Sequence, residues 1–171
     1  MLAMEDFCQL DGRLTQDKYR GSYERCAKII AAYSMNPGLD LSELFLRIAF
    51  SYAIGNSDMH LKNFSLIETI SGSRSYVMSA AYDMLPTNVV MPEDTEQLAL
   101  TLNGKKSNLD ISDFMDFAAT CGIPAKSAEN LINMTASMQP VYLAMCRSSY
   151  LPESMKKSLE RLIIERILKF L

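Results

Sequence analysis

The segment from residue 40 to 54 is almost continuously apolar, and it constrains the fold more than any other part of the chain. Its polar side chains Glu43, Arg47 and Ser51 recur at intervals of four, which predicts one narrow solvent-facing stripe along a helix. The rest of that helix must be covered by protein. We expect the helix to begin at Asp40, with a capping box between Asp40 and Glu43, and to form a rigid support for whatever follows it.

A dense polar cluster, G-N-S-D-M-H-L-K-N-F-S, follows this helix at residues 55–65. It places Asp58 and Asn63 five positions apart, and Asp83 comes twenty residues after Asn63. Phosphoryl transfer needs one carboxylate to orient the attacking hydroxyl, while an amide and a second carboxylate hold magnesium on the phosphates. We therefore predict that Asp58 orients the hydroxyl and that Asn63 and Asp83 bind Mg²⁺.

His60 and Lys62 lie between the predicted base and the predicted metal ligand. Either side chain can contact a phosphate oxygen, and the charge of Lys62 suits the developing transition state. The structural alternative for His60 is a hydrogen-bonded loop histidine. Asp58 has a structural alternative as well, because aspartate is common in turns and at helix ends. The combination of apolar helix, polar cluster and later aspartate favours the chemical interpretation.

A β-hairpin accounts for the distance in sequence between Asn63 and Asp83. Residues 64–67 and 76–78 resemble two short strands, with turn residues at 70–74 between them, so the chain returns close to where it left. Asp83 is surrounded in sequence by Ala80, Ala81, Met84 and Leu85, and an aspartate in an apolar setting needs a partner.

The remaining pattern is mostly helical. We expect helices at 22–35, 111–120, 125–148 and 152–171, with Pro140 splitting or kinking the third. The charged residues of the last helix are expected to face solvent. Residues 86–96 are predicted to be irregular, and 98–102 to be a short strand or a loop. The fold class is mainly α (α+β), a single domain over residues 1–171.

Composition excludes several classes of protein. The chain has 171 residues, 49% of them hydrophobic, and a formal charge of -3 without a basic run, which argues against direct nucleic-acid binding. No apolar stretch is long enough to cross a membrane. The four cysteines are isolated and there is one histidine, so we expect buried thiols, no structural zinc and a cytoplasmic location. For the twelve methionines, core packing is favoured over an adaptable binding surface.

The motif sequences carry a family resemblance. I-G-N-S-D-M-H-L-K-N-F-S at 54–65 and A-Y-D-M-L-P-T at 81–87 resemble the catalytic and metal-binding loops of the HipA-like serine/threonine kinases, toxins of bacterial toxin-antitoxin systems. M-E-D-F-C-Q at 4–9 and L-A-L-T-L-N-G-K at 98–105 are similar to other segments of that family. The likeness extends over most of the chain in consistent order.

The resemblance implies roles for three residues: Asp58 as catalytic aspartate, Asn63 as metal-binding asparagine and Asp83 as metal-binding aspartate. It also implies a protein-kinase-like C-lobe, a helical bundle with a small β-hairpin carrying the metal-binding loop. ATP and Mg²⁺ are the implied cofactors. A protein substrate and an antitoxin are the implied partners, and the chain itself is not expected to bind DNA.

The sequence departs from the family in lacking a phosphate-binding loop. It has no G-x-G-x-x-G and no early β-rich stretch for an N-lobe, so we expect a C-lobe alone, from a split gene, a truncated copy or a cut piece. Such a chain is expected to bind ATP poorly by itself, to need an N-lobe partner and to self-associate through its exposed lobe interface. The alternative hypothesis is a non-catalytic, kinase-like interaction module that binds an antitoxin or a target protein.

Overall fold

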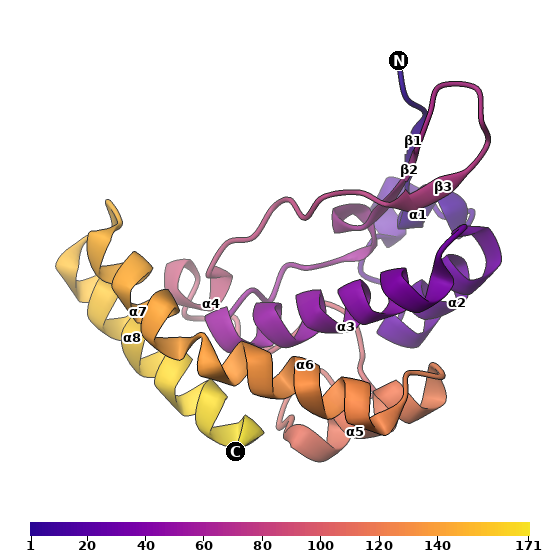
Figure 1. Cartoon of the computed structure of the whole chain (residues 1–171). Coiled ribbons are helices and arrows are strands. Elements are labelled where there is room, and N and C mark those ends of the chain that lie inside the picture. Colours follow the sequence, from indigo (N-terminus) through magenta and orange to yellow (C-terminus); the bar gives the residue numbers. More distant parts are fainter.

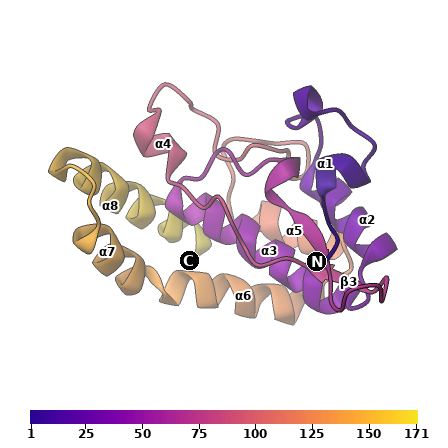
Figure 2. The same ribbon diagram turned by 90° about the horizontal axis from the view of Figure 1, so that it is seen from above.

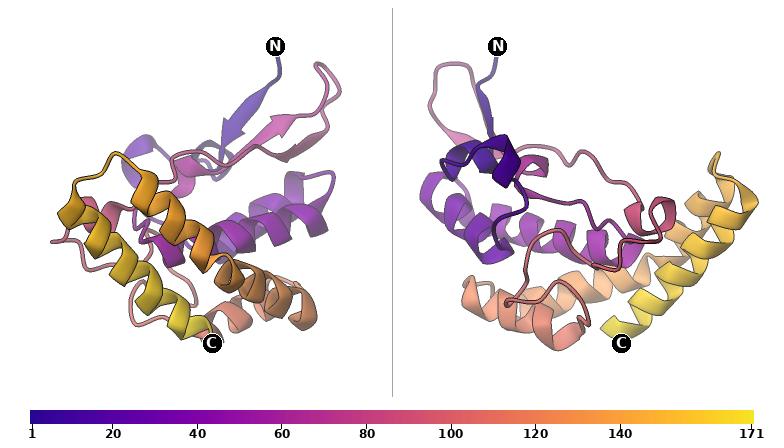
Figure 3. Two further views of the ribbon diagram at one scale, coloured as in Figure 1. Left: turned by 60° about the vertical axis from the view of Figure 1, so that its left-hand side comes forward. Right: turned by 180° about the vertical axis from the view of Figure 1, so that it is seen from behind.

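The helix α3 (Pro37–Ile54) crosses the middle of the molecule, with α2 (Tyr23–Tyr33) and a small sheet at its beginning and the polar loop of residues 55–63 at its end (Figure 1). The computed structural model describes all residues, Met1–Leu171. Helices α5 and α6 lie along one side of α3, and α7 and α8 pack near its C-terminal end (Figure 2). The two termini lie on opposite sides of the molecule (Figure 3). The predicted mainly helical fold with a small sheet is confirmed.

The molecule has three short strands, and its α-helices other than α3 have between four and fifteen residues. The strands are β1 (Met4–Asp6), β2 (Ser65–Glu68) and β3 (Tyr76–Met78). The remaining helices are α1 (Phe7–Leu10), α4 (Thr87–Val90), α5 (Ile111–Thr120), α6 (Ala125–Ser137), α7 (Gln139–Ser148) and α8 (Glu153–Ile167). Single 3-10 turns lie at Thr15–Asp17, Leu61–Asn63 and Leu168–Phe170.

The predicted start of α3 at Asp40 is wrong. The helix begins one turn earlier, at Pro37, because proline at the first helical position has no N–H to leave unpaired. Asp40 does not cap the helix. Its carboxylate is buried and accepts hydrogen bonds from the Ser34 hydroxyl (2.6 Å) and from the backbone N–H of Met78 (2.9 Å). This carboxylate therefore joins the end of α2 to strand β3 across α3.

The predicted solvent-facing stripe on α3 is also wrong. Arg47 and Ser51 are buried, and the segment after β3 contacts Arg47. The guanidinium of Arg47 donates from Nη2 to the carbonyl of Ser79 (2.5 Å) and from Nε to the carboxylate of Glu43 (2.7 Å). Arg47 thus anchors the segment that leads to Asp83.

The sheet has three antiparallel strands in the order β1-β2-β3. The β2–β3 hairpin was predicted, whereas β1 was not, since three residues carry no recognisable alternation. Met4 pairs with Ile67, and Ile67 pairs with Val77 on its other side. At the outer edge of β3 the carbonyl of Tyr76 accepts from the N–H of Met35 (2.8 Å). The sheet is therefore tied to the start of α3.

The C-terminal helices follow the sequence pattern closely. The helix α5 has the predicted bounds, and the long helical pattern after it splits at Met138, next to Pro140. α7 and α8 form a helical hairpin (Figure 3). Within the segment predicted to be irregular, residues 87–90 instead form the short helix α4. Residues 98–102 are a loop with isolated bridges, at Thr101 to Ser22 and at Leu102 to Lys105.

The core is continuous and centred on α3. Its largest fully buried side chains include Tyr23, Phe45, Tyr52, Phe114 and Phe117. Three cysteines are buried and Cys121 is half-buried, and all four are free thiols. None of the helices combines the length and the apolarity that crossing a bilayer requires.

The preference for core packing of the methionines is wrong for most of them. Met59 and Met78 are buried, whereas seven others are exposed: Met1, Met4, Met35, Met91, Met134, Met138 and Met145. Burial on α8 also differs from the prediction at three charged residues, because Lys156, Glu160 and Arg166 are half-buried. The guanidinium carbon of Arg166 lies 4.6 Å from the centre of the Tyr52 ring.

Candidate active site

The polar loop of residues 55–63 begins where α3 stops. Gly55 ends the helix with φ +75°, a left-handed conformation that glycine adopts without strain. A Cβ at this position would lie 2.9 Å from a methyl carbon of Leu162 on α8, so the absence of a side chain also permits close packing. The loop is therefore fixed at its start by the helix end and by α8.

Asp58 is half-buried within the loop, and two side chains hold it. Its backbone N–H donates to the amide oxygen of Asn56 (3.1 Å). Its carboxylate oxygen Oδ1 accepts from the hydroxyl of Tyr19 (2.5 Å), which comes from a segment 39 residues earlier. The carboxylate is thus oriented by a partner that the sequence did not suggest.

Asn63 and Asp83 are brought into contact by the β2–β3 hairpin. The amide nitrogen of Asn63 donates to the carboxylate oxygen Oδ2 of Asp83 (2.6 Å). The side chain of Asn56 donates to the backbone carbonyl of Asp83 (3.2 Å), so this one residue contacts both the Asp58 backbone and the Asp83 backbone. Asp83 itself has φ +58°, an uncommon conformation for a residue other than glycine. It is exposed, so the apolar surroundings inferred from its sequence neighbours are wrong, although it does have a partner.

The side chains of Asn63 and Asp83 are of the kind that binds a cation with a preference for oxygen ligands. Asn63 is only 2% exposed, and its amide oxygen has no hydrogen-bond partner. A buried polar atom without a partner is costly unless it serves another group. The amide nitrogen of the same side chain contacts the carboxylate of Asp83. No group of three or more His, Cys, Asp or Glu side chains is gathered there, and Mg²⁺ commonly needs only one or two protein oxygens, with water and phosphate supplying the rest.

His60 is buried in the loop, and its ring nitrogen Nδ1 has no hydrogen-bond partner. Its ring packs edge-on against Tyr19, with centroids 5.0 Å apart. Burial lowers the pKa of His60, and the positive charge of Lys18 lowers it further. The imidazole is therefore kept neutral, which suits packing under the loop.

Lys62 is already paired with another side chain. Its ammonium donates to the carboxylate of Asp6 (2.8 Å) at the junction of β1 and α1. That hydrogen bond raises the pKa of Lys62. Its backbone carbonyl accepts from the hydroxyl of Tyr82 (2.8 Å), the residue next to Asp83. Lys62 thus connects the sheet to the loop.

A second polar network lies on the far side of the loop. The Ser57 hydroxyl donates to the carboxylate of Asp94 (2.6 Å), and the Ser57 N–H donates to the hydroxyl of Thr87 (2.7 Å). The side chain of Asn88 also donates to Ser57 (3.1 Å). Sequence reasoning missed these residues together with Tyr19 and Asn56. Asn56 belongs to the polar cluster and could have been found there, whereas Tyr19, Thr87 and Asp94 are known only from their positions in space.

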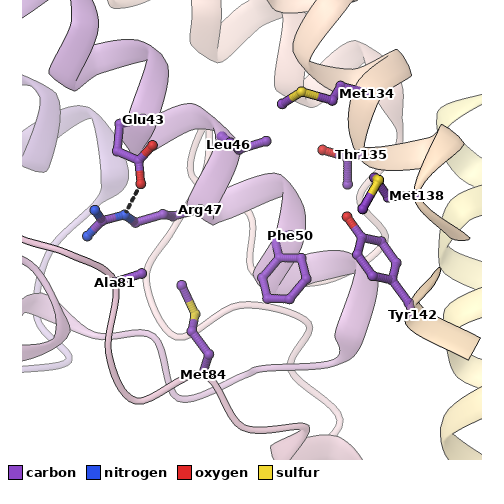
Figure 4. A pocket seen from close by; sticks show the side chains of 10 residues that line it. All are labelled: Glu43, Leu46, Arg47, Phe50, Ala81, Met84, Met134, Thr135, Met138 and Tyr142. Carbon is purple, nitrogen blue, oxygen red and sulfur yellow. Dashed lines mark hydrogen bonds and ion pairs between the residues drawn. The ribbon is translucent and has the colours of Figure 1, made fainter. Parts of the chain in front are cut away.

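An apolar groove lies behind the segment that carries Asp83. It encloses about 370 Å³ between α3, α6, α7 and residues 81–84 (Figure 4). Phe50 and Tyr142 face each other in it, with ring centroids 5.3 Å apart, and the Glu43–Arg47 ion pair lies at one end. Met134 and Met138 border it. A second hollow of about 300 Å³ continues from the first, since Phe50 and Tyr142 line both.

Comparisons with known proteins show the family of this chain. Residues 1–141 match the model of the HipA-like C-terminal domain. In Sinorhizobium fredii (strain NBRC 101917 / NGR234), the protein named "Putative kinase Y4dM" is 34% identical over 135 residues, which are 78% of this chain and 31% of that protein. In the same strain, the protein named "Putative kinase Y4mE" is 30% identical to this chain over 143 residues, which are 77% of this chain and 33% of that protein. The chain spans about a third of the length of these relatives.

Solved structures share the fold. A chain from the Shewanella oneidensis MR-1 toxin-antitoxin complex of HipA, HipB and operator DNA matches with a TM-score of 0.81 and 18% identity, over 96% of this chain and 42% of that one. The Helicobacter pylori proinflammatory kinase CtkA matches with a TM-score of 0.58 and 15% identity, over 98% of this chain and 68% of that one. By its family match, this chain is a member of the HipA-like C-terminal domain family.

Proposed function

We propose that this chain is the catalytic C-lobe of a serine/threonine protein kinase that acts within a toxin-antitoxin system. One observation carries the proposal: the amide nitrogen of Asn63 donates to the carboxylate of Asp83, while the amide oxygen of the same buried side chain has no partner. Family membership and the kinase names of the relatives support it. Asp58 supplies the third group that phosphoryl transfer needs, its carboxylate, and Asn56 links the backbone of Asp58 to that of Asp83.

In the proposed reaction Asp58 accepts a hydrogen bond from a serine or threonine hydroxyl and aligns its oxygen for in-line attack on the γ-phosphorus of ATP. The amide oxygen of Asn63 and the carboxylate of Asp83 are placed to hold Mg²⁺. When bound, Mg²⁺ neutralises charge on the phosphates. His60, being buried and neutral, supports the loop. Lys62 reaches a phosphate only by leaving Asp6, so its proposed contact with phosphate requires that ion pair to open.

The test uses the chain alone and the chain joined to the N-terminal region of a HipA-like kinase. We expect Mg²⁺-dependent transfer of labelled γ-phosphate to protein hydroxyls in the joined protein. Asp58→Asn and Asp83→Asn should each lower the rate by at least about a hundredfold, because each removes a charge that acts on the transferring group. Asp116→Asn, a change at an exposed position on α5, is the matched control and should leave the rate unchanged.

Equal labelling by the wild type and by both site variants would contradict the assigned roles. Loss of labelling in the Asp116→Asn control would show instead that the joined protein is damaged by any change of charge. Circular dichroism of each variant separates a folding defect from a chemical one.

The apolar groove favours a second candidate, a non-catalytic module that binds an antitoxin or a target protein. Four methionines that border the groove and its continuation, Met84, Met134, Met138 and Met145, give a surface that can adapt to a partner. In the Shewanella oneidensis complex the neighbouring protein is found with an antitoxin and DNA. Under this candidate, Phe50→Glu abolishes partner binding, whereas Asp58→Asn leaves it intact. Binding that is equally strong for both variants would exclude the groove as the binding surface.

A further inference from the structure

Two consecutive residues, Lys18 and Tyr19, make three separate contacts with the polar loop. The Tyr19 hydroxyl donates to Asp58 Oδ1 (2.5 Å). The Tyr19 ring lies edge-on against His60, with an interplanar angle of 76°. The Lys18 carbonyl accepts from the N–H of Leu61 (3.2 Å). The segment is therefore attached to the loop on both sides of Met59, although it lies about forty residues away in sequence.

The hydrogen bond has a defined direction. Burial raises the pKa of Tyr19 to about 12, and the hydrogen bond to Asp58 contributes to that increase. The phenol thus keeps its proton near neutral pH and donates it to the carboxylate. A hydrogen bond to an ionised acceptor is shorter and stronger than one between neutral groups. The contact can therefore fix the rotation of the Asp58 side chain.

The two oxygens of Asp58 are then different. Oδ1 is occupied by Tyr19, whereas Oδ2 has no hydrogen-bond partner within the chain. A base that must align an incoming hydroxyl works best when one oxygen is held and the other is presented in a fixed direction. Without Tyr19 the carboxylate can rotate about its Cβ–Cγ bond and form competing contacts with water.

We propose that Tyr19 is a positioning residue, which holds Oδ1 of Asp58 so that Oδ2 faces the attacking hydroxyl. This inference rests on the proposed role of Asp58. It gives the segment of residues 14–20 a role in positioning the base, although that segment lies outside the two motifs at residues 54–65 and 81–87. Its ring contact with His60 gives the buried histidine a related task, because the imidazole supports the ring that carries the hydroxyl.

The test is Tyr19→Phe in the joined, active kinase. This change removes the hydroxyl and keeps the ring against His60. We expect kcat to fall by about tenfold to a hundredfold, the effect of losing one hydrogen bond to a charged group, with KM for ATP unchanged. Tyr33→Phe on α2, which removes a hydroxyl from an exposed ring, is the matched control and should leave both constants unchanged.

An unchanged kcat in Tyr19→Phe would overturn the inference. A raised kcat would overturn it too, since it would show that Tyr19 occupies the place of the substrate hydroxyl and blocks it. Activity that survives Asp58→Asn would mean that the proposed function itself fails. Loss of activity in Asp58→Asn together with full activity in Tyr19→Phe would leave the proposed function standing and remove only the role of Tyr19.

A second measurement does not depend on activity. In the chain as it is, tyrosine labelled with ¹³C at the ring carbon that bears the hydroxyl reports the titration of Tyr19 by NMR. The pKa near 12 should move toward the ordinary value of about 10 in Asp58→Asn, because the charged acceptor is gone. A Tyr19 titration that is the same in both proteins would show that the contact is absent in solution, and would overturn the inference.

Discussion

Leu162 of α8 packs against Gly55, the residue at which α3 ends and the polar loop begins. The Cβ of any other residue at position 55 would come within 3.0 Å of both terminal methyl carbons of Leu162. The last helix of the chain thereby sets the position at which the loop leaves α3. Stability and the geometry of the site are coupled at this point.

Gly55→Ala should destabilise the fold by about 2–4 kcal/mol, the sum of left-handed backbone strain and of overpacking against Leu162. Gly12→Ala is the matched control, because Gly12 has a similar φ of +66° with nothing near its Cβ position. It should cost only the strain, about 1–2 kcal/mol. Urea unfolding of both variants measures the difference, and equal losses would show that Leu162 moves aside freely.

Asp40→Ala should cost about 1–3 kcal/mol. The change leaves the N–H of Met78 and the hydroxyl of Ser34 without their acceptor in a buried region. Asp116→Ala, at an exposed site within α5, should change stability by no more than about 0.5 kcal/mol. Chemical denaturation provides both values. If the two variants were equally stable, the hydrogen bonds of Asp40 to Ser34 and Met78 would make no contribution to the free energy of unfolding.

The stability of the chain should depend on the protonation of His60. Burial lowers the pKa of His60 in the folded state, assisted by Lys18 and opposed by Asp58 and Asp83. Protons therefore bind the unfolded chain more readily. The stabilising effect of neutral His60 is present above about pH 6.5 and is lost as the pH falls through the lower, folded-state value.

The measurement for His60 is the free energy of unfolding between pH 7.5 and pH 5. The wild type should lose more of it than His60→Gln does, and the difference in slope isolates this residue because the chain has no other histidine. Parallel curves for the two proteins would indicate that His60 is protonated without cost in the folded state.

A metal ion at Asn63 can be detected without turnover. Mn²⁺, a paramagnetic substitute for Mg²⁺, should broaden the side-chain amide NMR signals of Asn63, and Asp83→Asn should remove the effect. The side-chain amide of Asn103 donates to the carbonyl of Asp113 at the start of α5, and its signals serve as the internal control. Equal broadening at Asn63 and Asn103 would indicate non-specific binding of the ion.

Local signals in the sequence predicted the elements whose ends are defined by their own residues. α5 begins directly after Asp110, whose side chain caps the helix, and it ends before Gly122, so its bounds matched the prediction. The break next to Pro140 and the β2–β3 hairpin belong to the same class. The meeting of Asn63 and Asp83 followed from the hairpin, because two paired strands fix the distance between their ends.

Errors arose where distant segments decide the outcome. Asp40 fitted a capping box, but the N–H of Met78 and the Ser34 hydroxyl compete for its carboxylate. The spacing of Arg47 fitted an exposed stripe, but in the fold its guanidinium is buried and donates to the carbonyl of Ser79. No sequence pattern pointed to Tyr19, because the residue comes close to Asp58 only in the folded chain. Periodicity describes one helix at a time, and these contacts depend on how helices and loops are stacked.

The turn between β2 and β3 has a consequence for how proteins of this kind can diversify. Residues 70–74 project into solvent, while the paired strands below them hold the ends of the hairpin together. Lengthening a surface loop costs little free energy, because the entropy of closing it grows only slowly with its length. Insertions at this turn can therefore accumulate without changing the distance between Asn63 and Asp83, and new recognition surfaces can arise there while the chemistry stays constant.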